Sequence, residues 1–223
     1  VSHDLNLSSA DLLARCQALA ARGGFTAEQR HLIEQLMVDA NAMLGHVRRV
    51  TELTQIGSGR LQLHADPFDL GAIGRSLARG TDPDADRRVE VHVAEEVDRL
   101  YTGDGRRLHE VLQILRDNAT PPGAPAQVQV KLQPAGAEVQ FDIIGTTLPR
   151  EDESFAIPSA DTRQNSMLDL IIAQGLVQLM GGQITIRALP GEATWYSFQL
   201  GLAPSPAARA TAPVGPASLR EAT

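Results

Sequence analysis

The first part of the chain has the hydrophobic spacing of two helices joined by a short loop. Apolar residues recur at helical spacing between residues 4 and 21, and the paired glycines Gly23 and Gly24 end that pattern. Thr26 and Gln29 have the spacing of a capping box and predict the start of a longer helix. Its apolar residues alternate at intervals of three and four, at Leu32, Ile33, Leu36, Met37, Ala40, Met43, Leu44, Val47, Val50, Leu53 and Ile56. This spacing predicts an antiparallel hairpin. Because one hairpin would leave much of the stripe in water, we expect two copies to form a dimeric four-helix bundle.

The period changes after Gly57-Ser58-Gly59, where the long helix is expected to end. Alternating apolar residues predict strands at 89–93, 128–132, 139–144, 183–187 and 195–200, and helical spacing predicts helices at 104–118 and 168–179. Helices and mostly antiparallel strands in this order predict an α/β sandwich with one helical layer on one sheet. From residue 203 onward the chain is rich in Ala and Pro and lacks apolar periodicity, which predicts a flexible tail or linker.

Composition narrows the class of protein. A length of 223 residues suits two small domains, and 43% hydrophobic with 21% charged residues is typical of a soluble globular protein. The net charge of -7 argues against a nucleic-acid-binding surface. A single cysteine, Cys16, cannot form an internal disulfide, which fits a reducing cytoplasm. No apolar run is long enough to cross a bilayer, and no signal peptide precedes Val1. We therefore expect the cytoplasmic part of a longer protein, with any sensor or membrane segment upstream.

Two short segments carry candidate chemistry. Ser2-His3-Asp4-Leu5 places an imidazole beside a carboxylate at the start of the first predicted helix. A histidine ring can attack a phosphoryl group, and a neighbouring carboxylate can orient the ring or accept its proton. Leu115-Arg116-Asp117-Asn118-Ala119 places an asparagine near the end of a later helix. Taken alone, His3 could equally be an ordinary surface histidine, and Asn118 an exposed polar residue at a helix end.

The order and separation of these segments resemble the sensor histidine kinase family over about residues 2–200. Ile56-Gly57-Ser58-Gly59-Arg60-Leu61, Pro67-Phe68-Asp69-Leu70 and the run from Leu176 to Ile184 add to the resemblance. It implies an α + α/β architecture: a dimerisation and histidine-phosphotransfer hairpin over 1–64, a Bergerat-type ATPase domain over 65–202, and a tail over 203–223. It also implies that His3 is the phospho-acceptor with Asp4 beside it, and that Asn118 is a ligand of Mg²⁺ in the ATP site.

The departures from the family pattern fall in the ATP site. Ile143 stands where the first glycine box has the aspartate that bonds the adenine amino group, and Pro121 replaces a lysine after Asn118. The later glycine box has become Asn165-Ser166-Met167-Leu168-Asp169-Leu170, so side chains stand where glycines let backbone amides approach phosphate. Asp169 would add negative charge beside a polyphosphate. We therefore expect a degenerate ATP site that binds no cofactor tightly.

Three functions remain open on these residues. The first is phosphorelay or docking of a response regulator receiver domain at His3, by a homodimer whose own kinase activity is lost. The second is an active ATP-dependent sensor histidine kinase that uses ATP and Mg²⁺ through unusual contacts. The third is a non-catalytic pseudokinase scaffold that regulates another histidine kinase. Nucleotide binding would separate the active kinase from the other two, and the importance of His3 would separate relay from scaffold.

Overall fold

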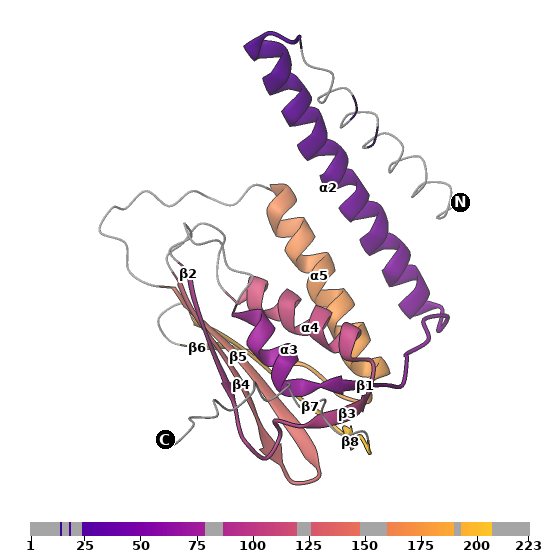
Figure 1. Cartoon of the computed structure of the whole chain (residues 1–223), viewed down its shortest axis with the longest axis vertical. Helices are drawn as coiled ribbons and strands as arrows, with labels where there is room; N and C mark the ends of the chain where they lie inside the picture. Colours follow the sequence, from indigo (N-terminus) through magenta and orange to yellow (C-terminus); the bar gives the residue numbers. More distant parts are fainter. Residues whose placement is uncertain are drawn as a thin grey trace, which may run out of the picture.

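The computed structural model describes residues 14, 18, 24–78, 87–119, 126–147, 160–189 and 193–206. The helices are α2 (Ala27–Gly57), α3 (Leu70–Leu77), α4 (Gly105–Asn118) and α5 (Ala160–Leu179). The strands are β1 (Asp66–Asp69), β2 (Arg87–Val93), β3 (Leu100–Gly103), β4 (Ala126–Ala135), β5 (Glu138–Thr147), β6 (Thr185–Leu189), β7 (Ala193–Leu200) and β8 (Ala203–Pro204). Figure 1 shows the long α2 rising from a layered body of helices and strands. His3 and Asp4 lie outside the described residues.

The predicted capping box is present at the start of α2. Gln29 N donates to Thr26 Oγ1 at 3.3 Å, and Thr26 N donates back to Gln29 Oε1 at 3.0 Å. These two bonds satisfy backbone donors that the first turn of a helix would otherwise leave unpaired. The helix ends at Gly57, with Ser58 as its C-cap. Both predicted ends of this helix are therefore confirmed.

Two sheets form the body of the molecule. The larger has the strand order β2-β4-β5-β7-β6, in which β2 and β4 run parallel and the other neighbours run antiparallel. A smaller sheet has the order β1-β3-β8. The helices α3, α4 and α5 lie on one face of the large sheet (Figure 1). The core between them contains stacked Phe141 and Phe198 rings, 4.7 Å apart between centroids. The predicted layer of helices on one sheet is confirmed.

Two segments differ from the sequence prediction. The last predicted helix begins at Ala160 rather than at residue 168, because its polar first turns carry no apolar periodicity for a sequence pattern to detect. Ala203 and Pro204, at the start of the predicted tail, pair with Thr102 and Tyr101 of β3. Backbone hydrogen bonds need no apolar side chains, so this short strand has no sequence signal.

The C-terminal part of α2 packs on the sandwich. Leu53 and Ile56 lie against the core cluster, and a Cβ placed on Gly175 of α5 would lie 2.7 Å from Ile56 Cγ2. Only glycine therefore allows this approach of α2 to α5 without rearrangement. No helix among the described residues is both long and apolar enough to span a membrane.

Candidate functional site

Asn118, the predicted magnesium ligand, is the last residue of α4 and is half-buried. Its Nδ2 donates to the carbonyl oxygen of Ile114, one turn earlier, at 2.8 Å. Its own carbonyl oxygen accepts a hydrogen bond from the hydroxyl of Tyr196 at 3.1 Å. Burial raises the pKa of this tyrosine. The amide is thus oriented by its own helix, and the helix end is tied to β7.

Ile143 on β5 points into the core and is fully buried. Its neighbours across the sheet are Val130 on β4 and Tyr196 on β7. At Gly145, a Cβ would lie 2.1 Å from the carbonyl oxygen of Ala119, so the backbone of β5 touches the end of α4 directly. This glycine is required by helix-to-strand packing. A buried hydrocarbon side chain therefore stands at the position where the sequence resemblance predicts the family's adenine-binding carboxylate.

Residues 165–170, which the sequence resemblance aligns with the later glycine box of the family, lie inside α5. The helix begins at Ala160, so Met167 lies seven residues after its first residue. Inside an α-helix each amide donates to the carbonyl four residues before it, whereas a helix binds phosphate through the unpaired amides of its first turn. The Met167 side chain is 66% exposed. The backbone amides around it are therefore engaged within the helix.

Asp169 lies between α5 and α2. Its Oδ1 is 3.6 Å from Nε of Arg49 on α2. Burial raises the pKa of Asp169; the positive charge of Arg49 opposes this rise, and the negative charge of Asp117 adds to it. The Asp169 carboxylate therefore takes part in the contact between α2 and α5.

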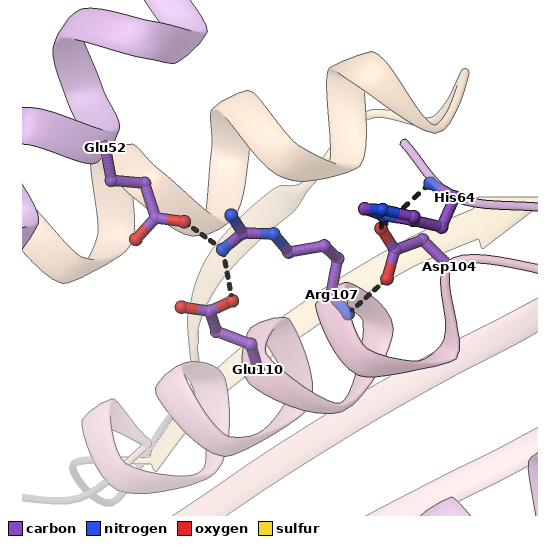
Figure 2. Close-up of polar contacts among 5 residues, drawn as sticks. All are labelled: Glu52, His64, Asp104, Arg107 and Glu110. Atoms are coloured by element: carbon purple, nitrogen blue, oxygen red, sulfur yellow. Dashed lines mark hydrogen bonds and ion pairs between the residues drawn. The ribbon is translucent and has the colours of Figure 1, made fainter. Parts of the chain in front are cut away.

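A second polar cluster lies at the other end of α4 (Figure 2). Asp104 caps the helix by accepting from Arg107 N at 3.0 Å, and it also accepts from His64 N at 3.1 Å and lies 3.4 Å from His64 Nδ1. Burial acts to raise the pKa of Asp104, but the hydrogen bonds from Arg107 and His64 outweigh it and lower that pKa. The carboxylate thereby ties the segment after α2 to α4.

The side chain of Arg107 extends this cluster to α2. Its Nη1 donates to Glu52 and, at 2.6 Å, to Glu110 (Figure 2). Burial and the charge of Glu110 raise the pKa of Glu52, against the effect of Arg107. Burial acts to lower the pKa of Arg107, but the two carboxylates raise it overall. The sequence does not predict this cluster; its one local signal is the spacing of Asp104 and Arg107 at a helix start.

Comparison with known proteins finds curated relatives and a solved structure that resemble this chain. No protein-family model matches the chain. Sensory/regulatory protein RpfC of Xanthomonas campestris pv. campestris is 25% identical over 222 residues, covering 91% of this chain and 30% of RpfC. Signal transduction histidine-protein kinase BarA of Escherichia coli is 24% identical over 207 residues, covering 84% of this chain and 22% of BarA. Full-length ShkA in complex with AMPPNP matches in structure with a TM-score of 0.75 and 20% identity, over 92% of this chain and 45% of that one.

The chain is therefore similar in sequence to curated sensor histidine kinases. The predicted resemblance to this family and the α+β kinase-like fold are confirmed. The chain spans less than a third of the length of the curated relatives RpfC and BarA.

The structure describes part of the site that the family resemblance predicts. Asn118, Ile143 and the segment around Asp169 come from α4, β5 and α5. His3 and Asp4, the predicted phospho-acceptor pair, lie outside the described residues, so their position relative to this site stays a prediction. Within the described ranges, no group of three or more His, Cys, Asp and Glu side chains is arranged to hold a metal ion.

Proposed function

We propose that this chain is a histidine-kinase-like module of two-component signalling that acts through His3, by phosphorelay or by docking a response regulator, and not through its own ATP. The observation that carries the proposal is the continuous α5, which runs through the segment equivalent to the later glycine box. A nucleotide there would meet side chains in place of the free amides of a helix start. The buried Ile143 offers no hydrogen bond to adenine, and such a loss costs on the order of 1–3 kcal/mol.

The same proposal includes a homodimer formed through α2. Four apolar residues along this helix remain about half exposed in the single chain: Leu32, Leu36, Met43 and Val50. They recur at coiled-coil spacing, and covering the exposed half of each would contribute roughly 1 kcal/mol per side chain. A second copy of the hairpin, completing a four-helix bundle, would cover them. We assign the hairpin to residues 1–64, the ATPase-like domain to 65–202 and the tail to 203–223, of which the first two residues pair with β3 as β8.

The partner in this proposal is the receiver domain of a response regulator. If the ATPase-like domain supplies no phosphate, a phosphoryl group on His3 must come from a phosphorylated receiver or from another histidine kinase. Docking would align the receiver aspartate with the imidazole, and Asp4 would favour the ring tautomer whose free nitrogen faces the phosphoryl group. We place the module in the cytoplasm, as part of a longer, membrane-associated sensor.

A phosphotransfer assay tests the proposal. A cognate receiver carrying ³²P on its aspartate should label the wild-type chain, His3→Gln should abolish the label, and Asp4→Asn should slow it. His31→Gln, which changes an exposed histidine on α2, is the matched control and should be labelled like the wild type. If His3→Gln leaves signalling in cells intact while Leu44→Glu abolishes it, the relay is wrong and the chain is a pseudokinase scaffold.

Two observations bear on the alternatives. The ion pair of Glu52 on α2 with Arg107 on α4 favours the scaffold, because it holds α2 and the sandwich in one arrangement. The complex of ShkA with AMPPNP favours the active kinase that uses ATP and Mg²⁺. A micromolar dissociation constant for a Mg²⁺–nucleotide complex would establish this second alternative.

A further inference from the structure

A cavity of about 420 Å³ lies between the last turns of α2, the segment that follows it and the first turn of α4. We call it the hinge cavity; the residues used below from its lining are Thr54, Ser58, Arg60, His64, Arg106 and Arg107. It lies at the start of α4, whereas Asn118 lies at the end of that helix. Its volume is within the range of small-molecule sites, roughly 300–1,000 Å³. Because it lies at the opposite end of α4 from Asn118, the hinge cavity is separate from the position that the family resemblance predicts for the nucleotide.

Among the described residues, the lining of the hinge cavity contains positively charged side chains but no negatively charged ones. Arg60 and Arg106 line it and are exposed, and no acidic side chain is part of its lining. Neither arginine forms an ion pair with another described residue. Three nearby acids have other partners: Glu52 and Glu110 bind Arg107, while Asp104 accepts hydrogen bonds from backbone amides. A fourth, the exposed Asp66, lines the adjacent cavity and not this one. The cavity wall thus presents positive charge that the local acids do not pair.

The hydrogen-bonding groups of the wall favour an anion bound by guanidinium groups. Thr54 Oγ1 donates to the carbonyl oxygen of Val50, and Ser58 Oγ donates to the carbonyl oxygen of Thr54. These two hydroxyl hydrogens are already used, and the cationic donors of the lining are its arginines, beside the neutral side chains of Thr51, Gln55 and Gln62. Guanidinium groups bind phosphate with two parallel hydrogen bonds, which a single ammonium or hydroxyl cannot supply. His64 is held at the rim by Asp104 (Figure 2).

We propose that the hinge cavity binds a small molecule through a phosphate group placed between Arg60 and Arg106. Arg60 belongs to the segment after α2 and Arg106 to α4, so one phosphate would contact both parts. Bound phosphate would therefore stabilise the arrangement in which α2 lies against the sandwich. This site is independent of the ATP site and of His3.

Calorimetric titration at constant ionic strength tests the site with two probes, pyrophosphate and ribose 5-phosphate. Binding of pyrophosphate alone would assign an inorganic ligand, and tighter binding of ribose 5-phosphate would assign a phosphate ester. Arg60→Ala and Arg106→Ala should each lower the affinity about tenfold or more, since each removes a charged hydrogen bond. Both side chains are exposed, so the variants should keep the fold, as circular dichroism can check.

Two control variants make the test specific. Arg88→Ala removes an exposed arginine from β2 and should leave the affinity unchanged. Asn118→Ala should also leave it unchanged. The proposal would be overturned if neither probe bound below about 10 mM. It would also be overturned if Arg88→Ala lost as much affinity as the two cavity variants, or if Asn118→Ala alone lost affinity. Bound pyrophosphate should slow amide hydrogen exchange in residues 58–65, and binding without slower exchange would overturn the bridging of α2 and α4.

Discussion

Substitution of Arg107 should destabilise the protein because this side chain joins α2 to α4. Its guanidinium binds Glu52 on one helix and Glu110 on the other. Arg107→Met keeps most of the aliphatic side chain but leaves the two carboxylates facing each other without a cation. The pKa of Glu52 is already raised, by burial first and by the charge of Glu110 second, and this variant would raise it further.

The size of the effect follows from the exposure of the pair. Removing one partner of a fully buried ion pair costs about 3–5 kcal/mol. Here the Arg107 and Glu52 side chains keep 14% and 16% of their exposure, and Glu110 keeps 32%, so water partly solvates the carboxylates left behind. We therefore expect Arg107→Met to lower the free energy of unfolding by about 2–3 kcal/mol. Glu52→Gln, which keeps a hydrogen-bond acceptor, should cost about 1 kcal/mol.

Urea unfolding of the wild type, the two single variants and the double variant measures the coupling between these side chains. A double-mutant cycle should give about 1–2 kcal/mol for the pair, because residues in one ion-pair network are not additive. Arg88→Met, on the exposed face of β2, is the matched control and should change stability by less than about 0.5 kcal/mol. A coupling energy below about 0.5 kcal/mol would refute the conclusion that Arg107 fixes α2 to the sandwich.

Three further predictions concern the proposed degenerate ATP site and the proposed dimer. Ile143→Asp should lower the free energy of unfolding, measured in urea, by more than about 3 kcal/mol, because it buries an unpaired carboxylate, and it should not create adenine binding. Ile144→Asp, on the other face of β5, should lower the free energy of unfolding less. Asp169→Asn should be more stable than the wild type at pH 7. A raised pKa means that the folded state binds the proton more tightly, so this gain should vanish as pH falls below about 3.9 and should be absent at pH 3 in urea midpoints. Leu36→Glu should halve the mass measured by light scattering at micromolar concentration, whereas Val38→Glu, exposed on the opposite side of α2, should leave it unchanged.

Local patterns in the sequence predicted the structural features whose interacting residues lie close together in the chain. The capping box at Thr26 and Gln29 is such a case, because both partners lie within one helical turn. The contacts that join the helices were not predictable in the same way. His64 and Asp104 are 40 residues apart, and Glu52 and Arg107 are 55 apart, so only the tertiary fold brings each pair together.

The stripe on α2 shows a further limit of spacing as a guide. Leu36 and Leu44 both fit intervals of three and four, yet Leu36 is 56% exposed in the single chain and Leu44 only 7%. Spacing identifies apolar positions but does not distinguish packing within one chain from packing between two. Leu44→Glu would therefore disturb one chain by itself, whereas Leu36→Glu tests the dimer.

Calorimetric titration of the purified chain with Mg²⁺ and a non-hydrolysable ATP analogue tests the central proposal most directly. The buried Ile143 and the amides paired inside α5 leave few groups to hold adenine or phosphates. We therefore expect weak binding, with a dissociation constant no tighter than about 1 mM, which corresponds to about -4 kcal/mol. A micromolar dissociation constant would contradict the degenerate site and establish the chain as an ATP-binding histidine kinase.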